Sequence, residues 1–156
     1  MLDAVDKFRN DKEPVILVFF GDHKPWLGEA GTTYSALGID IFGNNEQSFY
    51  NHYNTEYFIW ANDAAKRLLG NDFVGDGPSI SPCYLMNVLF NSCGFEGPSY
   101  LKLSNEVMEK MPVVSSKGRY MQNGVLVSEA ELSRENASLL NKFRKAQYYL
   151  TKDSKQ

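Results

Sequence analysis

Residues 14–23 read PVILVFFGDH, and this stretch decides the fold that the sequence predicts. Its apolar run, residues 15–20, is rich in β-branched side chains and has no polar face. Such a run is typical of a strand that helices cover on both sides. In open α/β sheets, the residues just beyond the carboxyl end of a strand line the functional crevice. We therefore expect a buried strand here and a functional site at Asp22 and His23.

Working outward, the chain alternates helix and strand signals. Amphipathic spacing and capping residues predict helices, while apolar runs and a turn dipeptide predict strands. Helices are expected over 3–9, 46–53, 82–93 and 100–111 and after the Ser128/Glu131 capping box, and strands over 57–61 and on both sides of Asn123-Gly124. Residues 21–45 are glycine-rich without periodicity, which predicts a long loop. The order of loop, helix and strand that follows favours a βαβ unit, and the predicted fold class is α/β.

Composition narrows the function classes. Apolar residues make up 43% and charged residues 22% of the 156 residues, which is typical of one folded domain over 1–156. The net charge of -3 gives no excess of positive charge of the kind that binds nucleic acid, so nucleic acid is not an expected partner. The longest apolar run is far too short to cross a bilayer, so the chain itself is expected to be soluble.

Asp22 and His23 are candidate metal ligands. A glycine directly before them permits an abrupt turn after which a carboxylate and an imidazole could meet at one ion. Oxygen and nitrogen ligands suit Mn²⁺, Zn²⁺ or Mg²⁺. From placement alone, the commoner explanation is an ordinary loop start in which the aspartate caps the turn.

Three sequence blocks carry a family resemblance. They are PVILVFFGDHKPWLG at 14–28, YFIWAND at 57–63 and GPSISPCYLMNVLFNSCGFEGP at 77–98. In this order they resemble the C-terminal half of the lipoteichoic acid synthase branch of the sulfatase and alkaline phosphatase superfamily. The resemblance covers about residues 10–100 and implies a C-terminal portion of that superfamily's mixed sheet, flanked by helices. One departure is Thr55-Glu56, where relatives tend to have proline after threonine.

The resemblance implies that Asp22 and His23 bind a catalytic divalent metal, Mn²⁺ first, with Mg²⁺, Zn²⁺ or Ca²⁺ as alternatives. The family's threonine nucleophile and its acidic metal ligand belong to the preceding half of the domain. No residue of this chain is therefore assigned as catalytic, and the threonines at 32, 33 and 55 are not taken as nucleophiles. The chain alone is expected to bind metal poorly and to be inactive.

The implied parent protein is a membrane-anchored bacterial enzyme at the extracytoplasmic face of the cell membrane. It would be a sulfatase or phosphoglycerol transferase that acts on a small-molecule or lipid-linked phosphate or sulfate ester in the synthesis of cell-envelope glycerophosphate polymers. The alternative is a non-catalytic binding or interaction module derived from a sulfatase fold. Half a domain would leave apolar sheet edges exposed, which predicts a tendency to form homodimers.

For several other side chains we expect structural roles and not functional ones. His52 lacks a carboxylate at helical spacing and is expected to be exposed or locally hydrogen-bonded. Core packing explains the aromatic residues between 49 and 60 better than a sugar or lipid platform does. Lys24 and Trp26 are only neighbours of the candidate site. Tyr148-Tyr149 is expected to anchor the last helix by packing.

Overall fold

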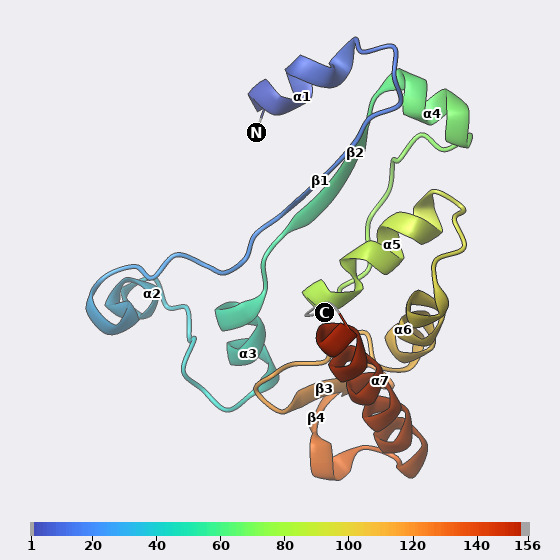
Figure 1. Ribbon diagram of the computed structural model, residues 1–156. Coiled ribbons are helices and arrows are strands. Elements are labelled where there is room, and N and C mark those ends of the chain that lie inside the picture. The colour runs from blue at the N-terminus through green and yellow to red at the C-terminus, as the bar shows by residue number, and fades with distance from the viewer. Residues whose placement is uncertain (1, 154–156) are drawn as a thin grey trace. The chain divides into compact units, whose positions relative to one another are not determined.

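The computed structural model describes residues 2–153, and the chain divides into two compact units, Met1–Phe73 and Val74–Gln156. Each unit combines helices with one two-stranded antiparallel sheet, as the ribbons in Figure 1 show. This content confirms the predicted α/β class. The single domain over 1–156 stays a prediction, and the two units are described separately.

The first unit is built around a two-stranded ribbon. Its elements are α1 (Leu2–Arg9), β1 (Ile16–Phe20), the 3₁₀ turn η1 (Glu29–Gly31), α2 (Thr32–Ala36), α3 (Glu46–Tyr53), β2 (Tyr57–Ala61) and α4 (Asp63–Leu69). The predictions of α1, both strands and α3 are confirmed. The expected loop over 21–45 is wrong in part, because it contains η1 and α2. Helix α4 was not predicted.

The strands β1 and β2 pair antiparallel, from Ile16 opposite Ala61 to Phe20 opposite Tyr57. The predicted βαβ unit is therefore wrong, since that unit requires parallel strands. Figure 1 shows the physical reason: α2 and α3 lie beyond the end of β1, so the chain returns along β1 instead of crossing over to its start.

Neither strand is buried as expected. No side chain of β1 is fully buried, and Phe20 keeps 59% of its surface exposed. Phe19 stacks on Phe58 of β2 with ring centroids 4.7 Å apart, but Phe58 is itself 38% exposed. Each strand has one sheet neighbour among the described residues, which explains why the side chains of both strands are only partly buried. The aromatic side chains between 49 and 60 are also only partly buried or exposed, so the core-packing interpretation is wrong for them.

Asn62 links the segment before β1 to the end of β2. Its side chain is 1% exposed and caps α4 by accepting from the backbone N–H of Ala65 at 2.9 Å. The same oxygen accepts from Val15 N–H at 3.1 Å, directly before β1. The amide nitrogen donates to the carbonyl oxygens of Phe8, Asp11 and Glu13. One asparagine thus holds the segment between α1 and β1 against the end of β2.

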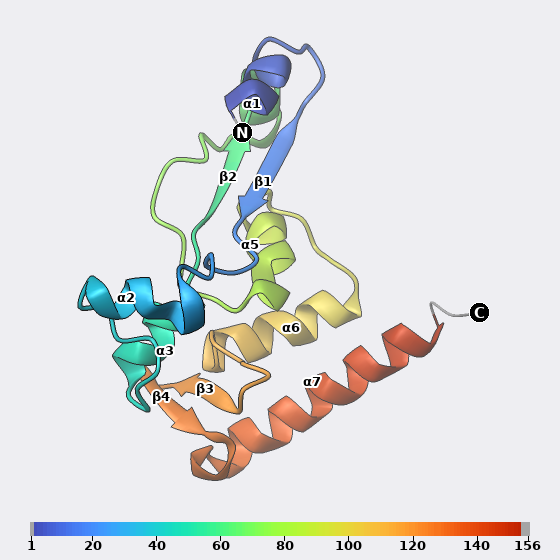
Figure 2. The ribbon, with the colours of Figure 1, turned by 90° about the vertical axis from the view of Figure 1, so that its left-hand side faces the viewer.

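The second unit has a larger apolar core. Its elements are η2 (Pro82–Tyr84), α5 (Leu85–Ser92), α6 (Ser99–Lys110), β3 (Arg119–Gln122), β4 (Val125–Ser128), η3 (Glu129–Glu131) and α7 (Arg134–Asp153). The core consists of Tyr84, Val107, Met111, Tyr120, Leu140 and Phe143. Figure 2 shows α6 alongside α7, with the hairpin near the start of α7. The predicted helices and the hairpin at Asn123-Gly124 are confirmed, although η2 forms the first turn of 82–93 and the capping box opens η3.

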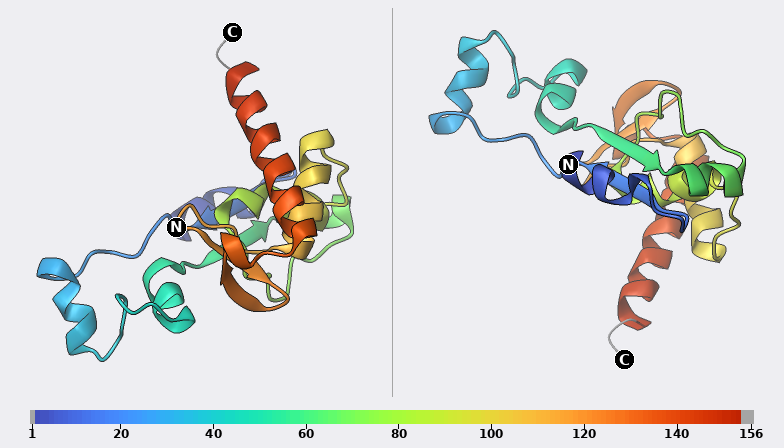
Figure 3. Two further views of the ribbon diagram at one scale, coloured as in Figure 1. Left: turned by 90° about the horizontal axis from the view of Figure 1, so that it is seen from below. Right: turned by 90° about the horizontal axis from the view of Figure 1, so that it is seen from above.

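The last turns of α7 correct another expectation. They extend past the other elements of their unit, as Figures 2 and 3 show. Tyr148 and Tyr149 are 55% and 64% exposed, so they do not anchor the helix by packing. The anchor is Phe143, which is 2% exposed and stacks on Tyr84 and Tyr100. Within residues 2–153, no helix combines the length and apolar character that a membrane crossing requires.

Candidate metal half-site and adjoining pocket

The end of β1 positions the candidate ligands. Gly21 donates its backbone N–H to the Glu56 carbonyl at 3.0 Å, and the Thr55 hydroxyl donates to the Gly21 carbonyl at 2.7 Å. Gly21 is not in the left-handed region, so an abrupt turn is not what requires glycine here. A Cβ atom at this position would lie 3.0 Å from Cβ of Thr55. Close approach of the segment after β1 to the segment before β2 is therefore the reason for glycine.

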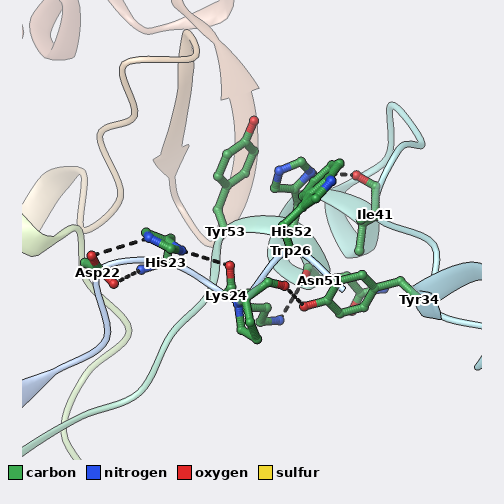
Figure 4. A pocket seen from close by; sticks show the side chains of 10 residues that line it. Asp22, His23, Lys24, Trp26, Tyr34, Ile41, Asn51, His52 and Tyr53 are labelled. Carbon is green, nitrogen blue, oxygen red and sulfur yellow. Dashed lines mark hydrogen bonds and ion pairs between the residues drawn. The ribbon is translucent and has the colours of Figure 1, made fainter. Parts of the chain in front are cut away.

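Asp22 and His23 face each other. Asp22 Oδ1 accepts the backbone N–H of His23 at 2.8 Å, which holds the carboxylate, and Oδ2 lies 3.5 Å from His23 Nε2. Nδ1 of His23 lies 2.9 Å from the Lys24 carbonyl oxygen. Because a carbonyl can only accept, Nδ1 carries the proton and Nε2 of the neutral ring has a free lone pair. The dashed lines in Figure 4 trace these contacts.

Asp22 Oδ2 and His23 Nε2 lie where two ligands of one metal ion would lie. Metal-bound histidines usually donate their second ring N–H to a carbonyl or carboxylate, as His23 does to Lys24. Two ligands at about 2.1 Å from an ion in tetrahedral geometry lie about 3.4 Å apart, close to the 3.5 Å that separates Nε2 from Oδ2. Both side chains are more than three-quarters exposed, so they are accessible to an ion and to further ligands.

The pair does not form a complete metal centre within the described residues. Across 2–153, no group of three or more His, Cys, Asp or Glu side chains could hold an ion. The structure therefore brings together two donor atoms, one oxygen and one nitrogen. A tetrahedral catalytic site needs three protein ligands and an open position.

Lys24 supports the loop that carries the pair. Its ammonium donates to the carbonyl oxygens of Asn51 at 2.7 Å and Tyr50 at 3.5 Å, both in the last turn of α3. A cation in this place satisfies terminal carbonyls and complements the negative end of the helix dipole. At its other end the helix is capped by Asn45, whose side chain accepts the Ser48 N–H at 2.9 Å. The sequence interpretation of Lys24 as a mere neighbour missed this contact.

A pocket of about 280 Å³ adjoins the pair. Residues 22–25 form one side, and the rest of the lining includes Trp26, Tyr34, Ile41, His52 and Tyr53. Figure 4 shows Asp22 and His23 at the left, with Trp26, His52 and Tyr34 toward the right. His52 donates its Nδ1–H to the Ile41 carbonyl at 2.8 Å, so the ring is hydrogen-bonded, but to a carbonyl eleven positions away and not to a near neighbour.

The sequence analysis missed His52 and Trp26 as pocket residues. They are 26 positions apart, and they meet because Lys24 ties the loop after β1 to the end of α3. Only Trp26 lies close to the glycine-aspartate-histidine motif in the sequence, and nothing in the sequence links the distant His52 to the same pocket. Thr55 has a structural contact, since its hydroxyl is bonded to Gly21.

Comparisons with known proteins add no assignment. No family model matches the chain, and the searches of curated proteins and of solved structures found no match.

Proposed function

We propose that this chain supplies Asp22 and His23 as two ligands of a divalent metal ion in an enzyme of the sulfatase or phosphoglycerol transferase type. The supporting observation is that the Lys24 carbonyl accepts from Nδ1 of His23 and leaves Nε2 opposite Asp22 Oδ2 at 3.5 Å. Oxygen and imidazole donors suit Mn²⁺, with Mg²⁺, Zn²⁺ or Ca²⁺ as alternatives.

The chemistry proposed is displacement at the phosphorus or sulfur of an ester. A divalent ion held here would stabilise negative charge on the transferred group and lower the pKa of a bound hydroxyl. The residues of this chain orient the donors: His23 N–H holds the Asp22 carboxylate, and the Lys24 carbonyl holds the imidazole. The nucleophile and the remaining ligands would come from outside residues 2–153.

We also propose the class of substrate and the place where the parent enzyme works. The ester would be a small-molecule or lipid-linked phosphate or sulfate ester, and the parent enzyme would work at the extracytoplasmic face of a bacterial membrane. The partly exposed faces of β1 and β2 support a homodimer or contact with further sheet strands. The resemblance of the three sequence blocks supports the enzyme class.

Paramagnetic NMR tests the metal site directly. Substoichiometric Mn²⁺ should broaden the amide signals of residues 21–24 before any others, because paramagnetic relaxation falls steeply with distance. Asp22→Asn and His23→Ala should each abolish this selective broadening, whereas His52→Phe, in the same pocket, should retain it.

The same Mn²⁺ titration distinguishes the metal-site proposal from the alternative of a non-catalytic binding module. Unselective broadening, or broadening that survives both Asp22→Asn and His23→Ala, would sink the metal proposal. The alternative, a non-catalytic binding module with a sulfatase-derived fold, would then be the better explanation of the chain.

A further inference from the structure

The pocket beside Asp22 and His23 has the size of a site for one small ring. Ligand pockets usually have volumes of roughly 300–1,000 Å³, and this one, at about 280 Å³, lies at the small end. A long acyl chain would not fit in this volume, whereas one sugar ring or a short polyol would.

His52 offers a hydrogen-bond acceptor to this pocket. Its Nδ1–H is donated to the Ile41 carbonyl, so Nε2 of the neutral ring carries a lone pair. The ring is held in place because it stacks on Tyr53, with centroids 4.3 Å apart and planes 22° apart. A hydroxyl group is the simplest ligand group that could donate to this nitrogen.

Trp26 offers an aromatic surface next to that acceptor. Trp26 is 57% exposed, and its ring centroid lies 6.2 Å from that of His52. The edge-on contact with Phe42 and the bond from the Tyr34 hydroxyl to the Pro25 carbonyl at 2.6 Å hold the segment in place. Exposed indole faces pack well against the C–H face of a sugar ring, because both surfaces are apolar and flat.

The charges around the pocket favour a neutral ligand. Without a metal ion, the Asp22 carboxylate disfavours an anion in the pocket. The Lys24 ammonium disfavours a cation such as a quaternary amine, although aromatic rings alone could bind one. A neutral ring with several hydroxyl groups satisfies the acceptor on His52 and the face of Trp26 without meeting a like charge.

We propose that Trp26 and His52 form a binding site for a neutral polyhydroxylated ring, with the ring against the indole and one hydroxyl donating to His52 Nε2. The proposal rests on the proposed function in one respect: the ring would be the alcohol portion of the ester whose phosphate or sulfate group lies at Asp22 and His23.

NMR shift titration of the metal-free chain, with EDTA present, tests this site. Methyl α-glucopyranoside should cause saturable shifts confined to the amides of residues 22–24, 26, 34, 41 and 51–53. Trp26→Ala should abolish these shifts. His52→Phe keeps a ring that can stack on Tyr53 but removes the acceptor, and should weaken binding about tenfold, which is the loss of one hydrogen bond. Signals outside the pocket report whether each variant is folded.

Controls make the outcomes decisive. The glycoside titration contains no metal and the Mn²⁺ titration contains no glycoside, so a failed metal site and a failed ring site are distinguishable. Choline and inorganic phosphate serve as the cationic and anionic probes. Saturable shifts with either of these but not with the glycoside, or no saturable shifts with any of the three, would overturn the proposal.

Discussion

Asn62 Oδ1 accepts the backbone N–H of Val15 at 3.1 Å, across 47 positions of the chain. The contact joins the start of β1 to the end of β2, and the amide nitrogen of the same side chain reaches three carbonyls of the segment before β1. A single buried amide therefore determines how the N-terminal segment lies on the ribbon that carries Asp22 and His23.

Asn62→Ala should destabilise the chain by roughly 2–4 kcal/mol, from the lost cap and the buried groups left unpaired. Asn45→Ala is the matched control, because Asn45 also caps a helix through one backbone N–H but is exposed. That variant should lose only about 1 kcal/mol. Urea unfolding measures both, and equal losses would contradict the special role of Asn62.

Glu129 should contribute a pH-dependent part of the stability of the second unit. Hydrogen bonds from Arg144, and then from the Tyr120 hydroxyl, lower the pKa of its carboxyl to about 2. A depressed pKa in the folded state means that this stabilisation is present above the unfolded value of 4.5 and is lost as the pH falls toward 2. Urea midpoints between these pH values should fall less steeply in Glu129→Gln. An unchanged slope in that variant would rule out this contribution.

Asn87 should contribute more to the stability of the chain than Asn91, which lies on the same helix α5. Asn87 is fully buried, donates to the Leu101 carbonyl and accepts from the Ser104 hydroxyl, each at 2.9 Å. Asn87→Ala should cost roughly 2–4 kcal/mol because those groups stay buried without partners. Asn91→Ala, at an exposed position of the same asparagine cluster, should cost under about 1 kcal/mol. The prediction fails if the two variants unfold at the same urea concentration.

Phe143 and Tyr149 provide a test of which residue anchors α7. Phe143→Ala should cost roughly 3–5 kcal/mol, because a buried ring is removed from between two aromatic neighbours. Tyr149→Ser should change stability by less than about 0.5 kcal/mol, as surface substitutions usually do. Thermal unfolding compares them, and a large loss in Tyr149→Ser would restore the packing role expected from the sequence.

Local patterns predicted most of the elements. Helix α3 and strand β2 lie where aromatic and apolar spacing placed them, and the hairpin turns at Asn123-Gly124. These signals work because capping, turn formation and side-chain alternation depend on residues within a few positions of one another. Helix α4 was missed because it has only seven residues and its cap, Asn62, also serves distant groups.

By itself, the sequence determined the α/β class, most element bounds and the candidate pair at Asp22 and His23. Tertiary structure alone decided the antiparallel pairing of β1 with β2, the partial exposure of their faces and the pocket formed by Trp26 and His52. The physical reason is range: Lys24 bonds to a carbonyl at Asn51 and His52 to one at Ile41, and no local propensity encodes which distant carbonyl a side chain meets. These contacts join the loop after β1 to α3 and so build the pocket beside the pair.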